Sequence, residues 1–168
     1  MGKKAAIWVS TVLYILITLA VLGIAYAAIK PRIDEMRDKA IIEQSITMLD
    51  DLDETIREVK EVEGTRRQIE IQLKQGTLIF ECVERRVSWQ YASAYKYSEI
   101  DRKIAIGNLY VLTKESRGGY NVTLSVEYGN DFDITFGGSK PIKRFTPAEV
   151  DYIFFIENKA GKIDIYNV

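Results

Sequence analysis

The chain contains no histidine and only one cysteine among its 168 residues. Histidine is the commonest general base and the commonest metal ligand, so its absence removes the side chain on which many active sites depend. The sequence also has no glycine-rich phosphate loop and no recognisable nucleophile motif. We therefore expect no enzyme, with no catalytic residue, no metal site and no cofactor.

The single cysteine, Cys82, cannot form a disulfide bond within the chain. In a strand pattern we expect it to be a small buried apolar residue, and an intermolecular bridge or a reactive thiol is the alternative. An excess of positive charge is lacking as well, because 23 basic and 24 acidic residues give a net charge of −1. A nucleic-acid binder needs a basic surface, so nucleic acid is excluded as a partner.

Charge is missing altogether from residues 5–29, which form one apolar run. At about 1.5 Å per residue, a helix of this length exceeds the ~30 Å hydrocarbon core of a bilayer. Lys3 and Lys4 stand directly before the run. The positive-inside rule then predicts a cytoplasmic N-terminus and a domain outside the cell membrane.

Three interpretations of this segment remain open. Ala25-Tyr26-Ala27 fits the cleavage pattern of a secretory signal peptide, although the run is much longer than the usual apolar region of such a signal. A permanent single-pass anchor is the second interpretation. The third depends on the residues at the front edge of the run, Lys4, Ala5, Ala6 and Ile7.

A short basic leader, a small residue and an uninterrupted apolar helix resemble the class III signal of archaeal type IV pilins. The resemblance implies that a prepilin peptidase cuts between Ala5 and Ala6, so that residues 1–5 are the leader. Residues 6–30 then stay in the mature chain as a transmembrane and filament-core helix. Ser10 stands where bacterial pilins have a glutamate, and no cysteine pair is present. Archaeal relatives commonly lack both features.

Residues 31–62 are predicted to form an amphipathic stalk helix. Pro31 lacks a backbone N–H, so it would kink a continuous helix or start a second one. One face is apolar at spacings of three and four, namely at Ile33, Met36, Ala40, Leu49, Leu52, Ile56 and Val59. The resemblance implies that the first part of this stripe packs on neighbouring subunits and the second part on the chain's own sheet. The alternative is a stripe that only covers the soluble domain or forms a coiled coil.

Residues 64–168 change to the alternating pattern of strands, after Gly64 as the helix cap. We predict strands over residues 69–73, 77–83, 86–97, 109–114, 120–128, 131–136, 152–157 and 162–166, joined by short turns. The fold class is therefore α+β: a long N-terminal helix packed on an antiparallel β-sheet or a small β-sandwich that forms an extracellular head.

Four aromatic residues share parity on the predicted strand 86–97: Trp89, Tyr91, Tyr95 and Tyr97. They pack in the core, or they form an exposed face for contact with subunits or sugars.

Asn121-Val122-Thr123 is an N-glycosylation sequon directly after a turn, and the surface filaments that the chain resembles are often glycosylated. Asn130, Asp131 and Asp133 lack the spacing of a calcium loop and are expected at a solvated strand edge.

The predicted function is a structural subunit of a type IV pilus-like filament involved in cell adhesion. Before assembly its helix would lie in the bilayer, and afterwards the helices of a helical homo-oligomer would pack together in an extracellular filament. Ala20, Gly23, Ala27 and Ala28 would allow close helix packing. The alternative is a single-pass anchored exterior β-sandwich that binds a partner without polymerising, similar in plan to archaellum stator proteins. A plain secreted domain is the third possibility.

Overall fold

The computed structural model describes residues 2–167, and it describes the side chains of residues 8–167. One helix, α1 (Gly2–Glu61), precedes ten strands in this described part of the chain. The strands are β1 (Arg66–Ile71), β2 (Thr77–Glu81), β3 (Arg86–Ser93), β4 (Lys103–Ile106), β5 (Leu109–Ser116), β6 (Gly119–Glu127), β7 (Asp133–Phe136), β8 (Ile142–Phe145), β9 (Tyr152–Lys159) and β10 (Lys162–Asn167).

The helix is unbroken in hydrogen-bonding pattern, and Pro31 lies inside it rather than at the start of a second helix. The kink predicted at Pro31 remains a prediction. Backbone contacts divide the chain into two compact units, Met1–Arg37 and Asp38–Val168. In the first unit every described side chain is exposed to solvent.

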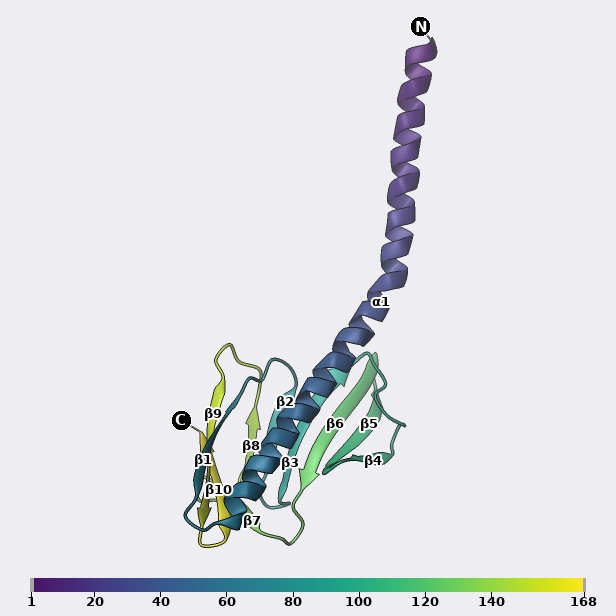
Figure 1. The fold of residues 1–168 in the computed structure, drawn as a ribbon. Helices are drawn as coiled ribbons and strands as arrows, with labels where there is room; N and C mark the ends of the chain where they lie inside the picture. The colour runs from purple at the N-terminus through teal and green to yellow at the C-terminus, as the bar shows by residue number, and fades with distance from the viewer. Residues whose placement is uncertain (1, 168) are drawn as a thin grey trace. The chain divides into compact units, whose positions relative to one another are not determined.

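The strands of the second unit form two sheets (Figure 1). One has four strands in the order β1-β9-β10-β7, and the other has six in the order β4-β5-β6-β3-β2-β8. All pairings are antiparallel except that of β10 with β7, which is parallel. The predicted α+β class, with a helix packed on antiparallel-rich sheets, is confirmed.

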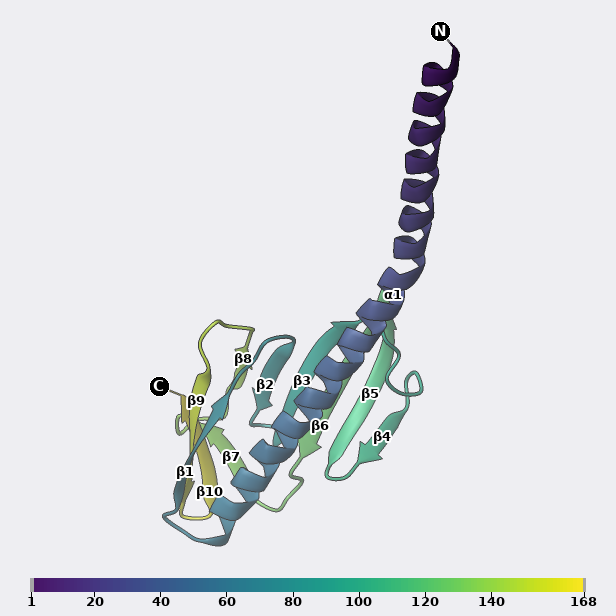
Figure 2. The ribbon, with the colours of Figure 1, turned by 45° about the horizontal axis from the view of Figure 1, so that its top comes forward.

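Alternation along the strands gives each sheet one apolar face, and residues 38–61 of α1 lie across the apolar face of β3 and β6 (Figure 2). The second part of the predicted stripe is buried there, at Leu49, Leu52, Ile56 and Val59. Ile42 is buried as well, although the sequence pattern did not single it out. Ile33 and Met36, in the first part of the stripe, are exposed. The stripe therefore changes from exposed to buried along one helix.

Phenylalanine side chains join the two sheets. The ring of Phe80 on β2 lies 5.6 Å from that of Phe136 on β7 and 5.4 Å from that of Phe154 on β9. Phe145 on β8 meets Phe80 and Phe154 edge to face. Such tilted and edge-to-face ring pairs stabilise the fold by more than the burial of their apolar area alone. Cys82 is buried beside this apolar cluster, as expected for a small core residue.

The C-terminal end of α1 is capped by Asn158, a residue near the other end of the sequence. The Asn158 side-chain amide donates to the carbonyl oxygens of Val59 at 3.1 Å and Lys60 at 3.0 Å. These carbonyls have no partner within the helix, so the amide satisfies groups that the helix end leaves open. Gly64 has a φ of +80° and donates its N–H to the Asn158 carbonyl, which supports its predicted role at the helix end.

The strand pattern differs from expectation most clearly in three places, and β1 also begins three residues earlier than predicted and ends at Ile71. The strand predicted over residues 86–97 ends at Ser93, because the chain then bends and leaves the ladder with β6. The short strands β4 and β8 were not predicted. Both are four residues long and rich in exposed side chains, so neither shows clear alternation.

Gly76 is required by the packing of Trp89. A Cβ atom at Gly76 would lie 2.5 Å from the Trp89 ring, and its φ of +77° is unfavourable for other residues. The turn also accepts a hydrogen bond from the Trp89 indole N–H at the Gln75 carbonyl, 3.0 Å away.

Replacing Leu52 with alanine is expected to lower the free energy of unfolding by about 2–5 kcal/mol, because it leaves a cavity in the core. Guanidinium unfolding of the full chain in detergent, followed by near-ultraviolet circular dichroism, measures this change. Gln44→Ala, at an exposed position of the same helix, should change stability by less than about 0.5 kcal/mol. Equal effects of the two substitutions would show that the helix is not packed on the sheets.

Candidate functional site

The apolar part of α1 is the first candidate site. Between Trp8 and Ile29 fourteen large apolar side chains are exposed, and the helix is long and apolar enough to cross a membrane. The Thr18 hydroxyl donates to the Tyr14 carbonyl at 2.8 Å, a bond that hydroxyl side chains commonly make to the preceding turn of a helix. The segment therefore offers an uninterrupted apolar surface, on which the Thr18 hydroxyl is satisfied within the helix.

The small residues predicted for helix packing lie on this surface. Ala20, Gly23 and Ala27 follow one another at spacings of three and four, so they share one helix face, and Ala28 lies beside that face. All four are exposed, and a Cβ atom at Gly23 would meet no atom within 4 Å. Nothing within the described chain occupies the space beside Gly23. The predicted leader residues Lys4, Ala5, Ala6 and Ile7 fall where the side chains lie outside the described residues.

The second candidate is the point at which the helix joins the strand domain. The Asp38 carboxylate is buried and accepts hydrogen bonds from the Tyr91 hydroxyl at 2.7 Å and the Ser93 hydroxyl at 3.3 Å. It also accepts one from the backbone N–H of Ala94 at 2.5 Å. These partners are more than fifty residues away in sequence, at the end of β3. Asp38 is also the first residue of the second compact unit, so this carboxylate marks where the helix begins to belong to the domain.

A second buried carboxylate lies lower on the same helix. The two carboxylate oxygens of Asp53 accept hydrogen bonds from the Arg57 Nε, at 2.9 and 3.0 Å. The Asn108 side-chain amide donates to Asp53 at 3.1 Å. Burial, followed by the nearby Asp53 carboxylate, raises the pKa of Tyr128 well above its ordinary value. Lys39 forms an ion pair with Glu43 at 3.7 Å.

The predicted aromatic face is divided between core and surface. Trp89 is completely buried, and its ring stacks on that of Tyr91 at 5.5 Å. Tyr95 and Tyr97 lie beyond the end of β3 and are half-buried, with their rings edge to face at a centroid distance of 6.3 Å. The interpretation of these four residues as one exposed face is therefore wrong, because Trp89 and Tyr91 face the helix rather than the solvent.

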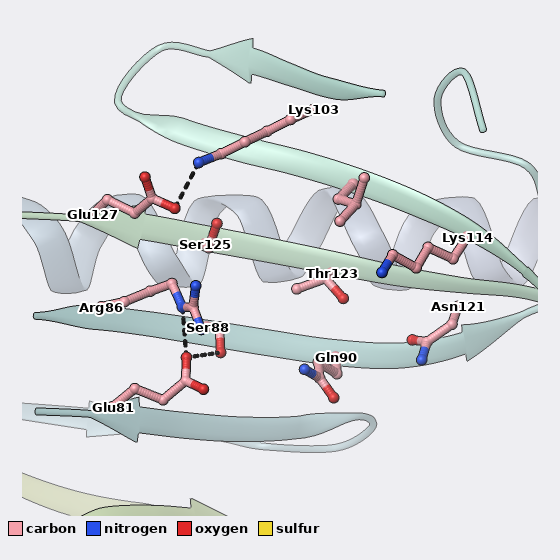
Figure 3. A pocket seen from close by; sticks show the side chains of 11 residues that line it. Glu81, Arg86, Ser88, Gln90, Lys103, Lys114, Asn121, Thr123, Ser125 and Glu127 are labelled. Atoms are coloured by element: carbon pink, nitrogen blue, oxygen red, sulfur yellow. Dashed lines mark hydrogen bonds and ion pairs between the residues drawn. The ribbon is translucent and has the colours of Figure 1, made fainter. Parts of the chain in front are cut away.

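The other face of the six-stranded sheet carries a shallow polar groove (Figure 3). The hydroxyls of Ser88 and Ser125 lie in its floor. Its two sides carry ion pairs, from Arg86 to Glu81 at 2.6 Å and from Lys103 to Glu127 at 2.6 Å. Each carboxylate in the groove is paired with a cation, so neither is placed as a free acid or base.

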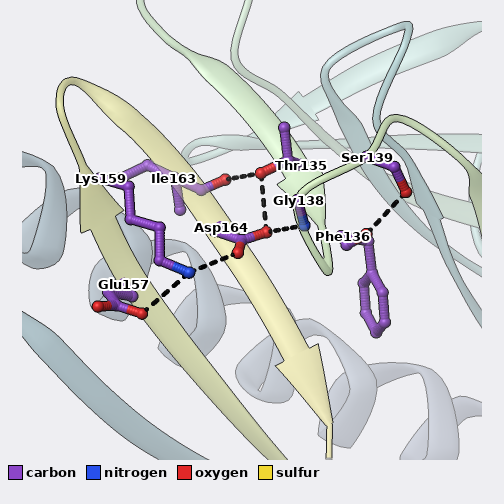
Figure 4. Close-up of polar contacts among 8 residues, drawn as sticks. All are labelled: Thr135, Phe136, Gly138, Ser139, Glu157, Lys159, Ile163 and Asp164. Carbon is purple, nitrogen blue, oxygen red and sulfur yellow. Dashed lines mark hydrogen bonds and ion pairs between the residues drawn. The ribbon is translucent and has the colours of Figure 1, made fainter.

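The corresponding face of the four-stranded sheet carries a network around Asp164 (Figure 4). Asp164 accepts hydrogen bonds from the Thr135 hydroxyl and the Gly138 N–H, each at 2.8 Å, and from Lys159 at 2.9 Å. Burial alone would raise the pKa of Asp164, but these hydrogen bonds outweigh it and hold the pKa below its ordinary value. The network links β10 to β7, which are paired in parallel.

Asp133 and Asn130, expected at a solvated strand edge, contact basic side chains. Asp133 forms ion pairs with Arg85 at 2.8 Å and Lys140 at 3.0 Å, and Asn130 accepts from Arg85 at 3.0 Å. Among the residues that the structure describes, no group of three or more histidine, cysteine or acidic side chains could hold a metal ion.

No protein-family model matches the chain, and no curated protein or solved structure resembles it significantly.

Replacing Asp38 with alanine is expected to loosen the first turns of the packed helix. The substitution removes the acceptor of the buried Ser93 hydroxyl, of the half-buried Tyr91 hydroxyl and of the Ala94 N–H. Losing the partner of a fully buried group costs about 1–3 kcal/mol, and the cost is smaller for groups that water can reach. Amide hydrogen exchange at residues 39–43 should become faster, while exchange in β9 and β10 stays unchanged. Lys39→Ala, at the adjacent exposed position, is the matched control. Unchanged exchange in the Asp38 variant would show that this carboxylate does not hold the helix.

Asp164 should contribute to stability in acid. Because its pKa is lower in the folded state, its contribution is complete above the unfolded pKa of about 3.9 and is lost as the pH falls through the folded pKa. Asp164→Asn should therefore be less stable than the wild type at neutral pH and lose less stability between about pH 4 and pH 2. Glu149→Gln, at an exposed carboxylate, should keep the wild-type acid profile. Parallel acid profiles for Asp164→Asn and the wild type would contradict this assignment.

Proposed function

We propose that the chain is a structural subunit of a type IV pilus-like surface filament, which it enters through its N-terminal helix. The observation that carries this proposal is the exposed apolar surface of residues 8–29 on a chain whose strand domain buries a complete core of its own. Such a helix needs a surrounding that water does not supply, either lipid or other apolar helices.

The stripe along α1 supports assembly beyond simple anchoring. Its second part is used within the chain, since Leu49, Leu52 and Ile56 pack on the sheets. Its first part, with Ile33 and Met36, continues the apolar surface past the length that a bilayer needs and is exposed. In a filament this first part would pack on neighbouring subunits. Transfer from lipid to a helix bundle exchanges one apolar surrounding for another, so close packing rather than the hydrophobic effect would drive it.

The alternative is a single-pass anchor whose exterior domain binds a partner and never polymerises. It is favoured by the same helix, because the length and composition that suit a filament core also suit a membrane span. The mature N-terminus separates the candidates. A start at Ala6 supports the filament subunit, an intact N-terminus supports the anchor, and a start near Ala28 supports a secreted domain.

Gly23→Leu is expected to abolish filaments while leaving the strand domain folded. Within one chain a side chain at Gly23 meets no atom within 4 Å, and leucine is the better helix former by up to about 1 kcal/mol. The substitution therefore acts only on neighbours that approach this face. Electron microscopy of fibres sheared from the cell surface measures the outcome.

The matched control is Val21→Leu, which also adds bulk but points about 200° away around the helix. We expect this variant to assemble. Abundant normal filaments from Gly23→Leu would contradict the proposed packing of this face. Absence of fibres from cells that make the wild-type chain would contradict the proposed function.

A further inference from the structure

The geometry points to Asn121 as the attachment site of an N-linked glycan on the outer face of the six-stranded sheet. Of the five asparagines in the chain, only Asn121 is followed by the Asn-Xaa-Thr pattern. The inference depends on the proposed function in one respect only, which is that the strand domain lies outside the membrane.

The strand conformation puts both functional groups of the sequon on one face. In β6 the side chains alternate, so Val122 is completely buried against the core while Asn121 and Thr123 point outward. Figure 3 shows these two side chains on the face opposite the helix. The acceptor amide and the hydroxyl that the sequon requires are thus presented together to solvent.

Neither group is engaged elsewhere. Among the described residues, the side chains of Asn121 and Thr123 have no hydrogen bond or ion pair. The residue opposite Asn121 on β3 is Ala92, which is small and exposed, and on β5 it is the exposed Lys114. A sugar joined to Asn121 therefore meets an open neighbourhood and displaces no contact.

The surface beside Asn121 is suited to a polar ligand. The groove that begins there is lined by amide and hydroxyl groups, among them Gln90, Thr123 and Ser125. Its charged side chains at Glu81 and Glu127 are already paired with cations. Sugar hydroxyls lying along this face would find donors and acceptors without having to separate an ion pair.

The reaction needs a co-reactant of one chemical class, a membrane lipid that carries an oligosaccharide through a phosphate or diphosphate. The Asn121 Nδ2 forms a bond to the anomeric carbon as the carbon–oxygen bond to the lipid phosphate breaks. The phosphate leaves with the electron pair of that bond, and Nδ2 gives up one proton. No electron is transferred to an oxidant or reductant.

Mass spectrometry of the full chain, isolated from the cells that make it, tests the inference. Trypsin does not cut before Pro141, so Asn121 lies in the peptide of residues 118–143. We expect this peptide to carry the mass of an oligosaccharide. Asn121→Gln and Thr123→Val should both remove the added mass, and Thr123→Ser, which keeps the hydroxyl, should retain it.

Protease added outside intact cells supplies the second measurement and separates the two proposals. An unmodified peptide from a strand domain that the protease reaches would overturn the glycan site and leave the proposed function standing. A strand domain that the protease does not reach would overturn both.

Discussion

The exposed apolar surface of α1 is the constraint on which the rest of the molecule depends. Fully burying a large apolar side chain is worth about 1.5–3 kcal/mol, so the fourteen such side chains between Trp8 and Ile29 represent roughly 20–40 kcal/mol as an upper bound. The same side chains are exposed in the unfolded chain, so this surface leaves the stability of the strand domain unchanged. It instead favours the transfer of residues 8–29 out of water, into a surrounding such as lipid or other apolar helices.

The strand domain holds the other part of the helix by specific contacts as well as by burial. Asp38 fastens the start of this part to the end of β3, and the Asn158 amide closes its last turn. Between these two contacts the side chains of Leu49, Leu52 and Ile56 fill the core. A helix tied at both ends of its packed region has a defined length inside the domain. The described side chains of α1 before Asp38 make no such contacts with the strand domain and stay exposed.

Much of this arrangement follows from the sequence because its signals are local. The uncharged run, the stripe at spacings of three and four, and the hairpin of β9 and β10 all depend on neighbouring residues. The contacts that position the helix are different in kind. Asp38 lies in a charged helical segment and gives no sign that it is buried, since its partners lie more than fifty residues away. The same holds for Asn158, whose position in a hairpin predicts a turn residue rather than a helix cap.

The short edge strands illustrate a second limit. β4 and β8 are defined by pairing with β5 and β2 rather than by their own composition. Likewise, the parallel pairing of β7 with β10 is accompanied by the Asp164 network, which joins residues from both strands and has no local signal in the sequence. The aromatic residues near β3 show the same effect, because strand parity placed four of them together, while the end of the strand at Ser93 separates them. Local patterns thus predict elements well and their partners poorly.

The state of the mature chain in the absence of detergent tests the central claim most directly. Sedimentation of the native chain, released from cells in aqueous buffer, measures whether a chain that contains residues 8–29 stays dissolved or sediments with membranes or fibres. The account predicts that every chain retaining this segment sediments with membranes or with fibres. A dissolved monomer that still contains residues 8–29 would contradict it.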